Sequence, residues 1–174
     1  MKQRTPKRAP RRKQTPDFPI RVTKLSHEGR GLVRWGERML FIDGALPDEL
    51  VSVRVTKKSS KTAEGVAKEI LVPSPARGQP ECPHAAVCGG CSLQHLPHQS
   101  QINHKSNTLD ELMTREGIAL DQVTRLPPLL GPTLGYRRRA RLGVRWVHAK
   151  GRVLVGFRER GSNFIADIDG CPVL

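Results

Sequence analysis

The sequence has few aromatic residues, few acidic residues and no long apolar run. Aromatic residues make up 4% of the 174 residues, and 16 Asp and Glu stand against 30 Lys and Arg. The apolar runs, such as residues 39–42, fall far short of the roughly 20 residues that a membrane span needs. We therefore expect no membrane partner. With 37% hydrophobic residues, the composition favours two small β-rich units over one large core.

The shortage of acids leaves a net charge of +14 and a pI near 10.5, which favour a polyanionic partner, most simply nucleic acid. The first residues are basic and no apolar segment follows them, so we expect no secretory signal and a cytoplasmic protein. Structural disulfides are rare in the cytoplasm, so the four cysteines favour metal binding or redox chemistry.

Composition divides the chain into three segments. Residues 1–16 hold seven basic residues, three prolines and no acid, which predicts a disordered basic arm, either a solubilising tail or a contact for phosphates. Residues 17–75 contain short alternating strands, clearest at Val51, Val53 and Val55, between Gly and Pro turns. This pattern predicts a small closed β-barrel. Three lysines that we predict to contact RNA fall in the loop before its last strand: Lys57, Lys58 and Lys61.

The third segment, residues 76–174, mixes element types. A linker over 76–81 precedes a Cys-rich loop, and a helix is expected over 98–116 with Gly117 as its stop. The other expected elements are hairpin strands at 136–147 and 153–158 and a short strand around Ile165 and Ile168. The expected fold class is therefore mainly β with some α.

The four cysteines form an asymmetric pattern. Cys82, Cys88 and Cys91 are separated by five and two residues, and the distant Cys171 is followed directly by Pro172. Four thiolates suit one tetrahedral zinc or one iron–sulfur cluster, but structural zinc sites usually bring two paired knuckles. The three-plus-one arrangement and the Cys-Pro ending favour a cluster, with zinc and unliganded thiols as alternatives.

Glycines and histidines flank these cysteines. Gly89 and Gly90 lack a Cβ, which lets backbone N–H groups approach the sulfurs closely. A histidine can replace a cysteine in a zinc site, but with four cysteines available we interpret the nearby histidines as solvated or helix-surface residues. They are His84, His95, His98 and His104.

Residues 136–160 hold nine basic residues and one acid. On a strand, Arg137, Arg139 and Arg141 would share one face, and Arg138 would lie on the other. Guanidinium groups bind phosphates and stack on bases, so we predict contact with RNA or DNA. The alternative is a solvated sheet face.

The cysteine pattern, the arginine stretch and the closing Cys-Pro occur in the order typical of the RNA uracil-C5 methyltransferases, and the sequence resembles the bacterial 23S rRNA branch of that family. The segments that carry the resemblance are residues 82–91, 135–142, 156–169 and 171–174, with residues 40–47 resembling the family's TRAM domain.

The resemblance implies an OB-like TRAM barrel at 17–75 that binds RNA, followed by the N-terminal part of an α+β central RNA-binding domain at 76–174. It implies a 4Fe-4S cluster on Cys82, Cys88, Cys91 and Cys171, 23S rRNA as partner, and S-adenosylmethionine as cosubstrate; we also expect a monomer. In the family reaction, a cysteine thiolate adds to C6 of the uracil, C5 takes the methyl group, and a carboxylate removes the C5 proton.

The sequence also departs from the family. No Gly-rich loop follows a strand in a βαβ unit, and the cluster motif claims every cysteine, so no catalytic residue is assigned. We therefore expect an N-terminal fragment that lacks the catalytic domain and is inactive alone. The alternatives are a stand-alone iron–sulfur RNA-binding protein and a zinc-ribbon protein of ribosomal type.

Overall fold

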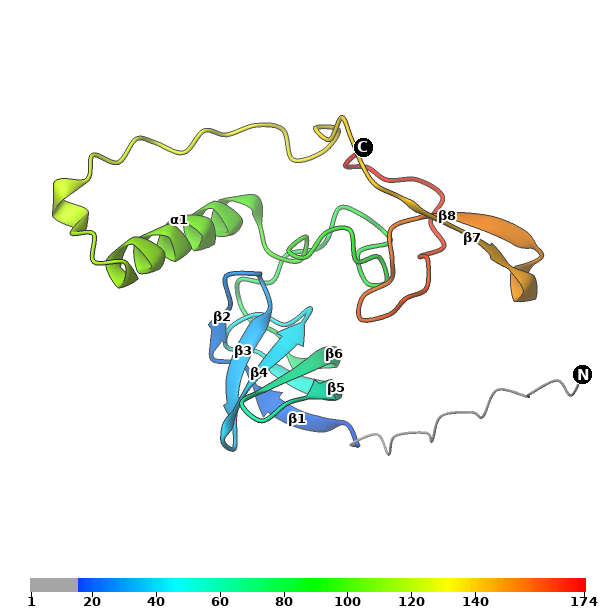
Figure 1. Cartoon of the computed structure of the whole chain (residues 1–174), viewed down its shortest axis with the longest axis horizontal. Coiled ribbons are helices and arrows are strands. Elements are labelled where there is room, and N and C mark those ends of the chain that lie inside the picture. Colours follow the sequence, from blue (N-terminus) through cyan, green and yellow to red (C-terminus); the bar gives the residue numbers. More distant parts are fainter. Residues whose placement is uncertain (1–15) are drawn as a thin grey trace, which may run out of the picture.

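The computed structural model describes residues 16–174, so the basic arm expected at 1–16 lies, except for Pro16, outside the described residues. Six strands form the first sheet (Figure 1): β1 (Phe18–Arg21), β2 (Lys24–Leu25), β3 (Gly31–Trp35), β4 (Arg38–Asp43), β5 (Leu50–Lys58) and β6 (Thr62–Val72).

The order of these strands closes the sheet on itself. Neighbours run β1-β5-β6-β4-β3-β2, with β4 and β6 parallel and the other pairs antiparallel. The two edge strands, β1 and β2, are consecutive in the chain and only Val22 and Thr23 lie between them. Because both edge strands belong to one short segment, the sheet must curl until its edges meet, as in a small barrel. The mainly β fold class is therefore confirmed.

Alternation along the strands builds the barrel core. In β5, Val51, Val53 and Val55 are buried, whereas Ser52 and Arg54 between them are only partly covered. They pack with buried residues of the neighbouring strands in one cluster. Each fully buried side chain of this kind contributes roughly 1.5–3 kcal/mol.

A buried ion pair fastens the segment after the barrel. The Glu49 carboxylate is fully buried and accepts hydrogen bonds from Arg77, whose guanidinium also donates to the Gly44 carbonyl (2.8 Å). Burial alone would raise the pKa of Glu49, but the bonds from Arg77 and from the N–H groups of Leu46 and Ser74 outweigh it and lower that pKa. The chain therefore leaves the barrel at a fixed point and direction.

The second region contains one long helix and one hairpin. Its elements are α1 (His98–Arg115), the 3-10 turns η1 (Leu120–Gln122) and η2 (His148–Lys150), and the strands β7 (Gly143–Val147) and β8 (Arg152–Gly156). The helix ends as expected, because Gly117 adopts φ 81° and its N–H bonds to the Thr114 carbonyl while Ile118 bonds back to Met113.

Two strand predictions differ from the structure. The strand expected over 136–147 begins only at Gly143, because the backbone before it bonds elsewhere: the N–H groups of Gly135 and Arg137 donate to the carbonyls of Pro172 and Val173. The strand expected around Ile165 is a single bridge to Arg158.

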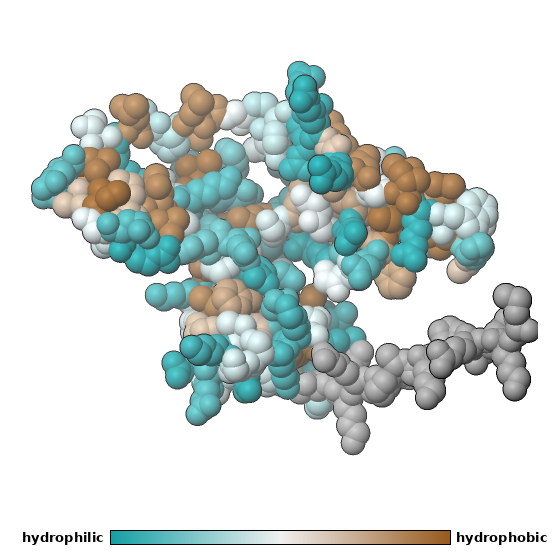
Figure 2. Space-filling model, viewed as in Figure 1, coloured by the Kyte–Doolittle hydropathy of each residue, from teal (hydrophilic) through white to brown (hydrophobic). Residues whose placement is uncertain are grey.

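Apolar side chains remain exposed on the hairpin. Val144 pairs with Val155 and Trp146 with Val153, and all four are about half exposed or more. Hydrophobic residues gather over this hairpin in the space-filling view (Figure 2), whereas the barrel surface is mostly hydrophilic. No helix in residues 16–174 has the length and apolar character to cross a membrane.

Candidate cysteine site and basic surface

The four cysteines lie around one pocket. Cys82, Cys88 and Cys91 come from the turns that precede α1, and Cys171 comes from the segment that follows β8. All four are half-buried with free thiols. The structure thus places the four residues of the predicted site together, although 79 residues separate the third from the fourth.

Backbone pairing between two distant segments brings the fourth cysteine close. The N–H of Gly89 donates to the Arg158 carbonyl (2.8 Å), and the N–H of Arg160 donates to the Val87 carbonyl (2.9 Å). The Arg160 guanidinium also donates to the Cys91 carbonyl at 2.6 Å. These bonds hold the segment after β8 against the Cys-rich loop, and the chain then turns back to the pocket.

Gly90 meets an aromatic ring and a sulfur at once. A Cβ on Gly90 would lie 2.8 Å from the Phe157 ring, closer than real Cβ atoms approach. Its N–H donates to the Cys88 Sγ at 3.4 Å, the kind of contact that the sequence predicts here. Gly89 instead faces the Arg158 carbonyl, 2.8 Å from where its Cβ would be. The glycines therefore serve close packing as well as access to sulfur.

The surroundings of Cys91 shift the pKa of its thiol in both directions. Burial raises the pKa of the Cys91 thiol, and the sulfurs of Cys171 and Cys88 raise it further, whereas Gln94 and Arg137 lower it. Gln94 also accepts a hydrogen bond from the Cys82 N–H (3.1 Å). Since metals bind thiolates, a metal here must displace thiol protons, and Gln94 and Arg137 favour that loss.

Within residues 16–174, no three Cys, His, Asp or Glu side chains have the geometry to hold a single metal ion. The cysteines therefore surround a pocket without meeting at one point. Of the histidines, only His84 lines this pocket, and His104 approaches the Ser26 carbonyl at 3.1 Å.

The interpretation of His95 as a solvated or helix-surface residue is wrong. Its ring is buried, because it lies under the packed turns between barrel and α1, near Arg77 and Arg160. Burial, with the charges of those two arginines, lowers the pKa of His95 to about 4. The ring is therefore neutral at pH 7.

The arginine row divides into two parts. Arg137 is half-buried and its guanidinium carbon lies 5.8 Å from the centre of the Phe157 ring. Its three neighbours are exposed and are called the exposed arginine triplet below: Arg138, Arg139 and Arg141. Sequence alternation groups Arg137 with Arg139 and Arg141, but that grouping assumes a strand, and residues 136–142 do not form one.

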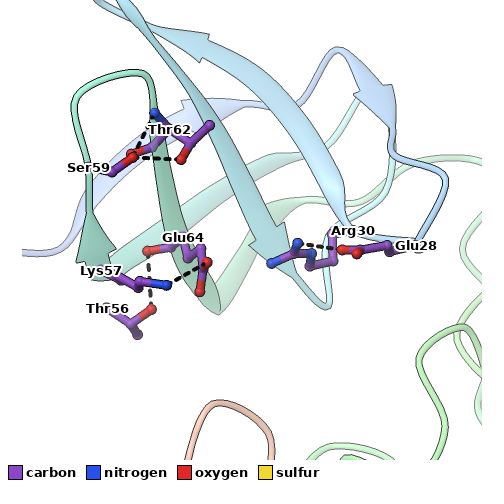
Figure 3. A network of polar contacts seen from close by, with 7 residues as sticks. All are labelled: Glu28, Arg30, Thr56, Lys57, Ser59, Thr62 and Glu64. Atoms are coloured by element: carbon purple, nitrogen blue, oxygen red, sulfur yellow. Dashed lines mark hydrogen bonds and ion pairs between the residues drawn. The ribbon is translucent and has the colours of Figure 1, made fainter.

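The three barrel lysines are exposed at one end of the β5–β6 hairpin, but only Lys61 lies in the expected loop, because β5 extends through Lys57 and Lys58. Lys57 pairs with Glu64 at 3.5 Å and Lys58 lies over the Trp35 ring at 4.7 Å. Figure 3 shows Lys57 reaching Glu64 beside the Ser59–Thr62 hydrogen bonds that shape the turn. Lys61 lies in that turn, and its carbonyl accepts from the Met39 N–H.

Sequence reasoning missed several residues that shape the cysteine pocket. Phe157 and Gln94 line it, and Arg160 bonds to its loop. The only signal for Gln94 is its position three residues after Cys91, and the other two lie too far along the chain for any local signal.

Comparison with known proteins agrees with the motifs. Residues 15–68 match the TRAM domain. A protein of Alkalilimnicola ehrlichii named 23S rRNA (uracil(1939)-C(5))-methyltransferase RlmD is 49% identical over 158 residues, which are 90% of this chain and 35% of the relative. Proteins of the same name from Alcanivorax borkumensis and Hahella chejuensis are 46% and 45% identical, over 95% and 94% of this chain and 38% and 37% of theirs.

This chain thus spans little more than a third of the length of these relatives. The identity extends over both the barrel and the Cys-rich loop, because it covers nine-tenths of the chain. Residues 15–68 are therefore similar to the TRAM domain, and about nine-tenths of the chain is similar to part of proteins named 23S rRNA (uracil(1939)-C(5))-methyltransferase.

Proposed function

We propose that this chain supplies the RNA-recognition part, with an iron–sulfur site, of an S-adenosylmethionine-dependent methyltransferase that forms 5-methyluridine in 23S rRNA. The observation that carries the proposal is the identity of 49% with a protein of that name across barrel and Cys-rich loop together. The proposed protein is a cytoplasmic monomer, and this chain corresponds to a part of it.

The proposed ligands of a 4Fe-4S cluster are Cys82, Cys88, Cys91 and Cys171. Four thiolates are the donor set of such clusters, and all four of these side chains line one pocket. A cluster binds each thiolate through a different iron, so it needs sulfurs around a pocket rather than at one point. The Gly90 N–H bonded to the Cys88 sulfur is the kind of contact that tunes cluster potentials.

A bound cluster would cross-link the Cys-rich loop to the segment that carries Cys171. It would also supply a site able to take up an electron. The protein residues prepare that site without it: Gly89 and Arg160 pair the two segments, and Phe157 covers the loop from one side. Closing a loop of this length costs entropy that metal–thiolate bonds can offset. We therefore assign the cluster a mainly structural role.

The proposed RNA contacts are the exposed arginine triplet and the three barrel lysines. Their side chains are exposed, and the net charge of +14 attracts a polyanion over the whole surface. Arginine forks bind phosphate oxygens in pairs, whereas lysines act as point charges. The uracil chemistry needs a thiolate nucleophile, a base and a methyl donor, and we assign these to the two-thirds of the relatives that this chain does not span.

Anisotropy titrations of the full chain test the RNA partner. At one salt concentration, a 23S rRNA fragment around the uracil that the relatives' names specify should bind more tightly than an unrelated rRNA fragment of equal length. Equal affinity for both fragments would contradict the proposed target and leave only general polyanion binding.

A further inference from the structure

Arg137 differs from the exposed arginine triplet in burial and in backbone bonding. It is half-buried, and its N–H donates to the Val173 carbonyl at 3.0 Å, two residues after Cys171. The N–H of Gly135 likewise donates to the Pro172 carbonyl at 2.9 Å. The backbone that carries Arg137 is therefore fastened directly to the segment that carries the fourth cysteine.

The Arg137 side chain contacts a ring that lines the cysteine pocket. Its guanidinium carbon is 5.8 Å from the centre of the Phe157 ring, within the range of a cation–π contact. That ring lines the cysteine pocket and packs against Gly90, between Cys88 and Cys91. Phe157 is therefore shared between the pocket and Arg137, because its ring lines the cysteine pocket and also lies against the Arg137 guanidinium.

Within residues 16–174, no carboxylate forms an ion pair with Arg137. In the part of the chain that the structure describes, nine ion pairs are formed and none involves Arg137. Arg137 instead lines a pocket together with Cys91, on the side of the Cys-rich loop that faces residues 129–137. Partly desolvated charges are normally paired, and thiolates that hold a metal group would supply the negative charge here.

We propose that Arg137 is a positioning residue of the cysteine site and not one of the RNA contacts. Its positive charge balances the negative charge of the metal group that the thiolates hold. The proposal rests on the proposed metal-binding role of the four cysteines. The arginine row then has two functions: Arg137 stabilises the cysteine site, and the exposed arginine triplet beside it binds the nucleic acid.

Three variants of the full chain separate these roles: Arg137→Gln, Arg137→Lys and the matched control Arg138→Gln, one residue away and exposed. Each is purified anaerobically. Iron, sulfide and zinc are measured, the cluster is titrated by spectroelectrochemistry, and the salt dependence of RNA binding is recorded. Circular dichroism shows that each variant is folded.

Arg137→Gln should shift the cluster potential to more negative values and speed loss of iron, because removing a nearby positive charge disfavours the added electron and the bound thiolates. Arg137→Lys should restore much of both, and Arg138→Gln should match the wild type. For RNA the order reverses: Arg138→Gln should flatten the salt slope, by about 0.7 if one phosphate contact on a single strand is lost, and Arg137→Gln should not.

Two results would overturn the inference while leaving the cluster intact: an unchanged potential and iron retention in Arg137→Gln, or a salt slope flattened as much as in Arg138→Gln. Zinc in the wild type would instead refute the proposed cluster. The inference would then stand if Arg137→Gln loses zinc faster than Arg138→Gln, and fall if the two rates are equal. A wild type that binds neither metal refutes both.

Discussion

Replacing Arg77 with alanine should strip the buried Glu49 carboxylate of the guanidinium that pairs with it. Arg77 donates to both Glu49 oxygens and to the Gly44 carbonyl, and the Glu49 side chain has no exposed surface. Removing one partner of a buried pair costs about 3–5 kcal/mol. The N–H groups of Leu46 and Ser74 still reach Glu49, so the lower end, about 3 kcal/mol, is expected. For a domain as small as the barrel at residues 17–75, that loss of unfolding free energy lowers the melting temperature by roughly 12 °C or more.

Thermal unfolding followed by circular dichroism at pH 7 measures this loss, with Arg54→Ala as the matched control. Arg54 also pairs with a carboxylate, Asp17, but this pair lies at the surface and should change the melting temperature little. Equal shifts in the two variants would show that the buried pair does not anchor the segment after the barrel.

The pH dependence gives the same pair a second test. Because the folded protein lowers the pKa of Glu49, its contribution to stability is present above the ordinary value of 4.5 and is lost as pH falls through the lowered pKa. In Arg77→Ala the buried carboxyl should take up a proton more readily when folded. That variant should therefore lose less stability on acidification than the wild type.

Three further predictions concern the site and the RNA. Gly90→Ala should loosen the pocket and lower its metal content, since the new methyl group meets the Phe157 ring at 2.8 Å, whereas Gly170→Ala, with open space at its Cβ, should keep full metal content. Replacing the exposed arginine triplet with glutamine should flatten the log–log salt slope of RNA binding by up to about 2, and an unchanged slope would identify these arginines as a solvated face. The chain alone should transfer no methyl group from tritiated adenosylmethionine to unmodified 23S rRNA, and turnover above a no-protein blank would contradict the placement of the chemistry outside it.

The sequence was sufficient for elements whose signals are local. The alternation of Val51, Val53 and Val55 predicts a strand buried on one face, and Gly117 marks the helix end at which it takes a positive φ. The sequence predicts a closed barrel but does not predict which strands pair. The parallel pairing of β4 with β6 is a long-range contact that no local pattern shows.

The sequence was not sufficient where distant segments meet. Residues 136–142 have strand-like alternation, but their backbone bonds to residues 172–173, so the arginine row does not alternate between two faces. Spacing predicts the four cysteines as a set, yet the ring of Phe157 and the bonds of Arg160 that assemble the pocket come from the fold. Burial of His95 likewise depends on how the turns pack on the barrel.

The iron and acid-labile sulfide content of the full chain after anaerobic purification, measured for the wild type and for Cys171→Ala, tests whether the four cysteines hold a cluster. We expect brown wild-type protein with equal amounts of iron and sulfide, close to four of each per chain for a 4Fe-4S cluster. Both should be lost in Cys171→Ala, since the fourth thiolate closes the pocket from the far segment. Full iron and sulfide in that variant, or a colourless wild type that holds zinc, would contradict the assignment of the cluster to these four cysteines.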